Sequence, residues 1–268
     1  MKIFNTKLDK LKYNNFLSEL LKLDKQNVVF TPNPEILLKT KTDLEFEKLL
    51  SRANYLTPDW IGLYIAFQIL DNNYWSIVNI LLLPYFFFNL FFRRKYLYNK
   101  YWDRICGSDL TKDIVLAAEK SEIKITILDL YNPKDLNKVK SQEVFPELLS
   151  KKFPNLIFDY FIYDPSKKED IIKLISSSTS KILFSTLWMK KQEESIIEIV
   201  WKSKNIKLWL WIGSSFDYFI WFQKRAPKIW RNLWLEWLYR LLTWPRKLDR
   251  LKRLWKAIFI FTYEVLKK

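Results

Sequence analysis

Short apolar runs alternate with longer segments of helical spacing between Ser108 and Gly213. The apolar runs predict buried strands at 123–130, 156–162, 181–187 and 206–213. The intervening segments predict helices at 109–120, which Ser108 is placed to cap, and at 134–152, 167–177 and 191–203. Strands that alternate with helices of this length form right-handed βαβ units. We therefore predict an α/β fold with a Rossmann-like, mostly parallel sheet flanked by helices, in which ligands bind beyond the carboxyl ends of the strands.

The first third of the chain follows the same plan. A helical segment at 8–22 precedes a short strand at 27–30, which the Thr31-Pro32-Asn33-Pro34 run ends. Helical segments around 35–53 lead to a second extended stretch, 54–58, just before Asp59. Beyond Asp217 the chain changes to basic, aromatic helical segments. We predict an α/β domain over 1–221 with a lipophilic insertion at 71–103, and a helical, membrane-associating appendage over 222–268.

The insertion contains a nearly continuous apolar run. Residues 77–92 read IVNILLLPYFFFNLFF, and Arg93-Arg94-Lys95 follows at once. Sixteen residues broken by Pro84 and two asparagines are short for a transmembrane helix. The pattern favours an interfacial or re-entrant segment with basic side chains that reach toward the headgroups. A buried core hairpin and a true span remain as alternatives.

The charge is strongly basic and unevenly distributed. The formal net charge is +16, and residues 224–268 hold thirteen Lys or Arg against three acidic residues, about +10. Such a segment requires an anionic partner, either nucleic acid or an anionic membrane. Its Trp, Tyr, Phe and Leu residues favour the membrane surface. A basic face that is only solvated is the alternative.

Histidine is absent and Cys106 is the one cysteine. This composition excludes a disulfide framework, a zinc cluster and an imidazole base. Catalysis must therefore use carboxylates, arginines, amides and hydroxyls. The first fifteen residues contain no apolar core of a signal peptide, so we expect a cytoplasmic protein.

Seven short motifs follow one another in the loops and near the C-terminus. They read TPNPE at 31–35, TPD at 57–59, RICGSDL at 104–110, KQE at 191–193, GSSFD at 213–217, KRAP at 224–227 and LEWLYR at 235–240. Over residues 27–260 this order resembles the WecG/TagA/CpsF glycosyltransferases, glycosyltransferase family 26. The pattern of that family is TxNxE, PDG, RxxGxDL, LGxPKQE, GGxFD, GxxxRAP and GLEWLYRL.

The resemblance implies a hexosyltransferase that moves N-acetylmannosamine or a related sugar, with inversion, from UDP to the GlcNAc of an undecaprenyl-diphosphate intermediate. Such products feed teichoic acid, enterobacterial common antigen or capsule synthesis. The implied partners are a UDP-sugar, a lipid-diphosphate-linked sugar and an anionic membrane surface on the inner face of the cell membrane. No cofactor or obligatory metal is implied, and the sequence contains no Asp-x-Asp pair. Nucleic acid is not expected as a partner, and homo-oligomerisation stays open.

The resemblance also implies roles for individual residues. Asp59 matches the general base, which takes the proton from the attacking sugar hydroxyl. The implied substrate-binding residues are Thr31, Asn33, Arg104, Gln192, Arg225, Arg240 and Arg246. Five of these residues have a plainer reading. Thr31 and Asn33 can end a strand and cap a helix, and Asp59 can be a turn residue. Gln192 can belong to the first turn of a helix, and Arg240 can pair with Glu236.

Tryptophan stands where the family has glycine. The chain holds 3 glycines and 13 tryptophans, whereas average usage of about 7% would give roughly nineteen glycines. The matching positions are Trp60, Trp188, Trp211, Trp221 and Trp234, with Trp102 and Trp209 as further cases. Since tryptophan tolerates neither positive φ nor close backbone approach, we hypothesise that these codons are UGA, read as glycine in the source organism. A decayed enzyme and tryptophans that anchor to a membrane are the alternatives.

Two other functions remain possible from the sequence. The first is a catalytically inactive, membrane-associated scaffold of the same fold, against which the intact Asp59 and Gln192 argue. The second is a basic nucleic-acid-binding protein, whose binding would weaken steeply with salt. The glycine-rich turn of the family after its third strand is replaced here by residues 128–131 (LDLY), so the donor contacts of that loop are in doubt.

Overall fold

The computed structural model describes residues 1–72, 74–130, 136–186, 199–213, 215–216, 226–232, 235–243 and 247–267. Within these ranges the side chains of residues 130, 136–141, 228, 232, 240 and 247–250 are not described.

Six described strands form one parallel sheet in the order β4-β3-β8-β7-β5-β6. Their bounds are β3 Asn27–Phe30, β4 Tyr55–Leu56, β5 Ile125–Leu130, β6 Phe158–Tyr163, β7 Ile182–Ser185 and β8 Leu208–Trp211. In the register, Val29 of β3 lies opposite Tyr55 of β4 and Leu210 of β8, so the loops after these three strands open at one edge. The predicted α/β, Rossmann-like sheet is confirmed.

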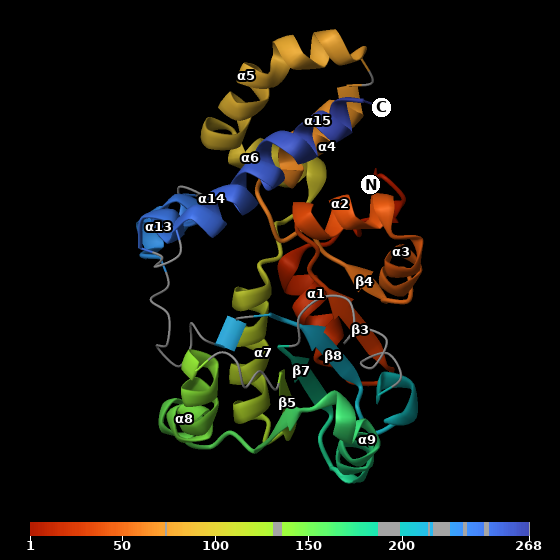
Figure 1. The fold of residues 1–268 in the computed structure, drawn as a ribbon, viewed down its shortest axis with the longest axis vertical. Coiled ribbons are helices and arrows are strands. Elements are labelled where there is room, and N and C mark those ends of the chain that lie inside the picture. The colour runs from red at the N-terminus through yellow and green to blue at the C-terminus, as the bar shows by residue number, and fades with distance from the viewer. Residues whose placement is uncertain are drawn as a thin grey trace.

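Helices cover both faces of this sheet, as buried parallel strands require. Helices α1 (Tyr13–Leu20), α7 (Gly107–Lys120) and α8 (Leu136–Lys152) pack on one face. Helix α9 (Lys168–Ser177) and the helical residues 199–202 pack on the other. Figure 1 shows α8 and α9 on opposite sides of the strands.

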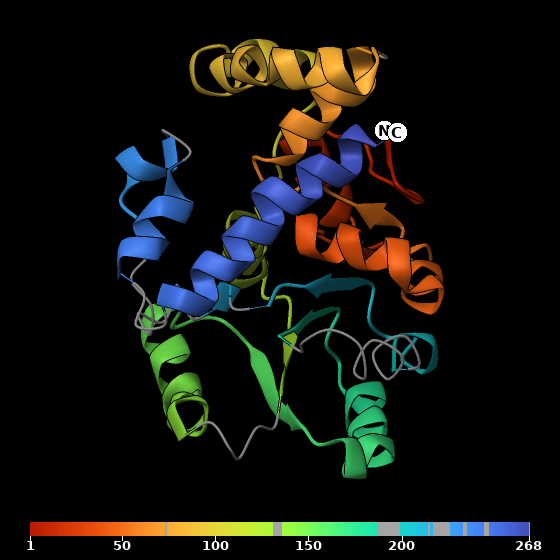
Figure 2. The same ribbon diagram turned by 45° about the horizontal axis from the view of Figure 1, so that its top comes forward.

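A second body of helices lies beyond the edge of the sheet formed by β3 and β4, at the top of Figure 1. It shares one hydrophobic core among its helices. Its elements are β1 Lys2–Ile3, β2 Thr6–Lys7, α2 Pro34–Thr42, α3 Leu44–Leu50, α4 Leu63–Asn72, α5 Ser76–Phe92, α6 Arg94–Tyr101 and α15 Phe261–Leu266. The two ends of the chain meet there (Figure 2), where the rings of Phe4 and Phe261 pack edge to face with centroids 5.9 Å apart.

The C-terminal region is helical wherever it is described. It contains α12 (Lys228–Asn232), α13 (Glu236–Thr243), α14 (Lys247–Trp255), a π-helical segment η2 (Lys256–Ile260) and α15. The final turns of this region are not detached, because Phe261, Val265 and Leu266 are buried in the core with α2 and α4. The division of the chain at 221/222 falls outside the described residues and stays a prediction.

The predicted elements agree with the structure in most places. The six strands of the parallel sheet fall within or close to the predicted runs, and helices occupy the predicted segments 109–120, 134–152 and 167–177. Strands β1 and β2 were not predicted, and the helix predicted at 8–22 forms only over Tyr13–Leu20. The predicted cap was wrong: α7 begins at Gly107, Cys106 takes the N-cap position, and Ser108 lies inside the first turn. The reason is that a carboxylate from another segment, Asp59, meets the start of this helix, as described below.

The apolar run 77–92 forms one continuous helix, α5, which passes through Pro84. The alternative of a buried hairpin was therefore wrong. Within the described part of the chain no single helix has the length and hydropathy of a membrane span, although α5 and α6 together, bent by 99°, meet that test as a pair.

Candidate functional site

The loops after β3 and β4 meet the first turn of α7. The backbone N–H of Ile105 donates to the carbonyl of Pro58 at 3.2 Å, which ties the loop after β4 to the segment before α7. The N–H of Gly107 donates to Oδ1 of Asp59 at 3.3 Å. A Cβ atom added to Gly107 would lie 3.1 Å from Oγ1 of Thr31, so Thr31 packs directly on the same turn. Two predicted site residues, Thr31 and Asp59, thus converge on the start of α7 at the carboxyl ends of neighbouring strands.

Asn33 lies at the start of α2 and caps it. Its Oδ1 accepts a 3.0 Å hydrogen bond from the N–H of Ile36, and Pro34 follows at the first helical position. The alternative that Asn33 caps a helix is therefore correct for its side-chain oxygen. The cap uses only the amide oxygen, so the Nδ2 donor of Asn33 is not engaged in it.

Arg104 lies among negative groups at the same place. Burial lowers the pKa of its guanidinium, but the nearby Cys106, Asp59, Tyr98 and Glu236 outweigh burial and raise that pKa. The arginine is therefore held permanently charged beside the Asp59 carboxylate. A fixed cation at the strand ends is suited to an anionic ligand such as a diphosphate.

Two residues in this group were not predicted as site residues. Cys106 lies between Arg104 and α7, its Sγ is 3.2 Å from Oγ of Ser108, and burial followed by the charge of Asp59 raises the pKa of its thiol to about 11. Glu236 begins α13 and is only 9% exposed, and its charge acts on both Arg104 and Cys106. Both lie inside motifs of the sequence, RICGSDL and LEWLYR. Their proximity depends on how the C-terminal region folds back, which spacing does not encode.

The C-terminal region contacts the start of α7 directly. Nη1 of Arg231 in α12 lies 3.8 Å from Oδ1 of Asp109 in the first turn of α7. Its Nε also donates to the carbonyl of Ala226 at 3.1 Å, which orients the guanidinium. This contact and the position of Glu236 bring the basic helices of the appendage to the Asp59 edge of the sheet.

Four predicted substrate-binding residues cannot be placed in this group. Gln192, Arg225 and Arg246 lie outside the described residues, as does the side chain of Arg240. Their roles, and the pairing of Arg240 with Glu236, stay predictions. The described residues hold no cluster of three or more Cys, Asp or Glu side chains arranged for a metal ion.

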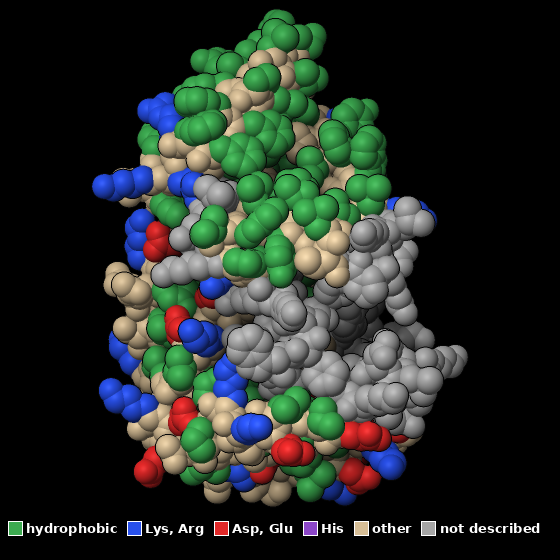
Figure 3. Space-filling view, turned by 90° about the vertical axis from the view of Figure 1, so that its left-hand side faces the viewer, with side chains coloured by type: hydrophobic (Ala, Val, Ile, Leu, Met, Phe, Trp, Pro, Cys, Tyr) green, Lys and Arg blue, Asp and Glu red, His purple; other side chains and the backbone are tan. Residues whose placement is uncertain are grey.

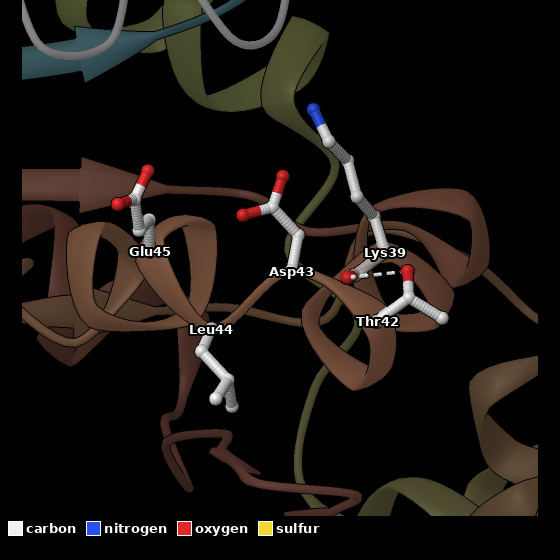
Figure 4. A pocket seen from close by; sticks show the side chains of 5 residues that line it. All are labelled: Lys39, Thr42, Asp43, Leu44 and Glu45. Atoms are coloured by element: carbon white, nitrogen blue, oxygen red, sulfur yellow. Dashed lines mark hydrogen bonds between the residues drawn. The ribbon is translucent and has the colours of Figure 1, made fainter.

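An open surface depression lies elsewhere, at the junction of α2 and α3 (Figure 4). Figure 4 shows Lys39, Asp43 and Glu45 directed to one side of this junction and Leu44 to the other. Its polar atoms serve the local backbone: Asp43 caps α3 by accepting from the N–H of Phe46 at 3.1 Å. No predicted site residue lines it, so it is not the candidate site.

Backbone geometry at Trp102 is that of a glycine. This residue has φ 76° and ψ 178°, a region that residues with a side chain rarely adopt. The indole N–H groups of Trp102 and Trp209 are buried without an acceptor among the described residues. Trp60 presses against Gly62, where an added Cβ would lie 1.7 Å from the indole ring. Among the described tryptophans at these positions, Trp102 has positive φ and Trp60, Trp209 and Trp211 do not. Trp188, Trp221 and Trp234 lie outside the described residues.

A parallel α/β sheet with a carboxylate and an arginine at its strand ends is the architecture of an enzyme that binds anionic ligands there. The model of the glycosyl transferase WecG/TagA/CpsF family matches residues 1–86 and 89–268, and the chain belongs to this family. It is accordingly a glycosyltransferase of cell-surface polysaccharide synthesis, which uses a sugar donor and a lipid-linked acceptor.

Proposed function

We propose that the protein is an inverting, metal-independent hexosyltransferase. In this proposal it transfers N-acetylmannosamine or a related sugar from UDP to a polyprenyl-diphosphate-linked GlcNAc. The single observation that carries the proposal is the grouping of Asp59, Arg104 and Thr31 at the first turn of α7.

The proposed reaction is a single displacement at the anomeric carbon of the donor. Asp59 accepts the proton of the attacking GlcNAc hydroxyl, and the oxygen of that hydroxyl forms a bond to the anomeric carbon of the donor. The bond between this carbon and the UDP oxygen breaks, and UDP leaves with the electron pair. Arg104 offsets the charge of the departing diphosphate, with the basic appendage as a second source of cations.

Sugar transfer is tested with purified protein, a GlcNAc-diphosphate-lipid analogue and UDP-N-acetylmannosamine, followed by a panel of other UDP-sugars. We expect a lipid-linked disaccharide with inverted anomeric configuration, formed in the presence of EDTA. If none of the donors gives a product, the result would support the inactive scaffold instead. Binding of duplex or single-stranded nucleic acid that weakens steeply with salt would support the remaining alternative.

The proposal includes glycine at the family positions now occupied by tryptophan. The gene is expected to carry UGA at codons 60, 188, 211, 221 and 234, with 102 and 209 as further cases. The glycine-type backbone of Trp102 and its unpartnered indole N–H support this reading. Codon UGG at these positions would contradict it. Activity is therefore to be measured both with these tryptophans and with glycine in their place.

We further propose that the protein binds peripherally to the inner face of the cell membrane. Two attachment signals are available, since the chain combines an apolar insertion with a basic C-terminal region. The acceptor diphosphate would then lie in the headgroup zone, within reach of the Asp59 edge of the sheet.

A further inference from the structure

Helix α5 has its polar side chains turned toward the protein. Asn79 and Asn89 are buried, and the buried Gln68 of α4 contacts Asn89. Nδ2 of Asn89 donates to Oε1 of Gln68 at 2.8 Å, while Nε2 of Gln68 donates to the carbonyl of Phe86 at 3.3 Å. Helices at a water-facing surface have the opposite arrangement, with apolar side chains inside.

The outward face of α5 is apolar along its whole length. Ile77, Leu81, Phe88 and Phe92 follow one another at spacings of four, seven and four residues, which places them on one stripe. They are 70%, 74%, 50% and 76% exposed. On the face shown in Figure 3, hydrophobic side chains gather over the upper part, whereas Lys, Arg, Asp and Glu side chains are scattered over the lower part. Contiguous exposure of this kind marks an interaction surface.

A second apolar stripe continues the surface through the C-terminal helices. Leu251, Trp255, Phe259 and Tyr263 recur at every fourth position and are each more than half exposed. The two stripes belong to the same end of the molecule: Oγ of Ser76, at the start of α5, donates to the carbonyl of Leu266 in α15 at 2.5 Å. Three of the four positions in this stripe, and all four in α5, are not tryptophan, so the surface does not depend on how tryptophan codons are read.

The exposed charged side chains that border the two stripes are mainly basic, although Asp71 pairs with Lys100 and Glu264 pairs with Lys41. Residues 72–102 contain no acidic side chain, and Arg93, Lys95 and Lys100 are exposed immediately after α5. Lys252, Arg253 and Lys256 are exposed beside the second stripe. Basic residues that border an exposed apolar face complement anionic headgroups above an acyl-chain layer.

The length and bend of α5 favour a position in the plane of a membrane. Its 17 residues extend about 26 Å at 1.5 Å per residue, less than the roughly 30 Å of a hydrocarbon core. The chain then turns by 99° into α6, whose exposed residues are mostly polar or charged.

We infer that α5 lies in the surface of an anionic phospholipid bilayer with its Ile77–Leu81–Phe88–Phe92 stripe against the acyl chains. This inference deepens the proposed membrane location. It does not depend on the donor sugar or on the role of Asp59, so its test is separate from the transfer assay.

The full-length protein is tested by co-sedimentation with vesicles of phosphatidylcholine alone and of phosphatidylcholine mixed with phosphatidylglycerol. We expect the triple variant Ile77→Ser/Leu81→Ser/Phe92→Ser to bind both vesicles at least about tenfold more weakly than the unchanged protein. The matched control is Leu44→Ser/Leu116→Ser/Leu174→Ser, three exposed leucines outside the two stripes, which should bind as the unchanged protein does. Arg93→Gln/Lys95→Gln should lose mainly the preference for phosphatidylglycerol.

A second measurement keeps the inference testable if the triple variant folds poorly. In a Cys106→Ser background, a polarity-sensitive dye is attached to Leu81→Cys or to Leu174→Cys. Mixed vesicles should shift the emission of the first dye to the blue and leave the second unchanged. Equal emission at both positions would overturn the inference. It would also be overturned if the α5 variant kept full vesicle binding and instead dissociated an oligomer, because α5 would then be a contact between copies of the chain.

Discussion

Oδ1 of Asp59 accepts a 3.3 Å hydrogen bond from the backbone N–H of Gly107, so the carboxylate after β4 caps the first turn of α7. A helix N-terminus stabilises negative charge, and this bond fixes one oxygen of the carboxylate at the start of α7. The same contact explains why α7 needs no capping side chain of its own.

Arg104 and Glu236 should act as a unit. Replacing Arg104 with Gln removes the fixed cation, and the loss of one hydrogen bond to a charged ligand, about 1.5–3 kcal/mol, should weaken UDP binding roughly tenfold to a hundredfold. Glu236→Gln should weaken it less, because that residue acts through Arg104. Calorimetric titration of UDP into both single variants and the double variant should give a cost below the sum. Additive costs would show that Glu236 does not position Arg104, and Arg52→Gln, an exposed arginine, is the control.

The thiol of Cys106 should lose its proton at a higher pH than an ordinary cysteine. Its pKa is raised from 9.0 to about 11, first by burial and then by the charge of Asp59. Between these values the folded protein keeps a proton that the unfolded chain has lost, so the free energy of unfolding falls as pH rises from about 9 to 11. Alkylation by iodoacetamide should follow a midpoint near 11, and Asp59→Asn should lower it. A midpoint near 9 would contradict the arrangement.

Asn89 should anchor α5 to α4. Asn89→Ala leaves the buried Oε1 of Gln68 without its 2.8 Å donor, which should cost about 1–3 kcal/mol in the free energy of unfolding. Urea denaturation measures this cost, with the exposed Asn99→Ala as the control. Equal midpoints for the two variants would mean that the Gln68–Asn89 contact does not hold the helix.

At position 102 glycine should give a more stable protein than alanine, which is the reverse of their order inside a helix. Trp102→Gly and Trp102→Ala leave nearly the same cavity, but only glycine adopts φ 76° and ψ 178° without strain, so the glycine variant should be more stable by about 1–3 kcal/mol. At Trp255, with helical φ −56°, alanine should be the more stable by about 1 kcal/mol. Thermal unfolding of the four variants compares both pairs. An alanine preference at position 102 would remove the backbone argument for a native glycine.

The sequence predicts the sheet well because buried parallel strands are mostly apolar, as in residues 182–184 (ILF) and 208–211 (LWLW). It predicts the convergence of Thr31 and Asp59 because both follow neighbouring strands. It does not predict the capping of α7, since Asp59 and Gly107 are 48 positions apart. Nor does it predict the place of Glu236, which depends on the packing of α12 and α15 on the body of the protein. The continuation of α5 through Pro84 was missed because burial of one helix side offsets the lost hydrogen bond.

The most direct test of the account is sugar transfer by the Asp59→Asn variant. Asparagine keeps an oxygen that can accept from Gly107, so the fold should persist, whereas the loss of the base should lower kcat by about 10²–10⁴-fold. The assay measures lipid-linked disaccharide formed from UDP-N-acetylmannosamine, or from whichever UDP-sugar the panel identifies, with Asp24→Asn as an exposed carboxylate control. A large loss at position 59 alone supports Asp59 as the base. Unchanged transfer by Asp59→Asn would contradict the central claim.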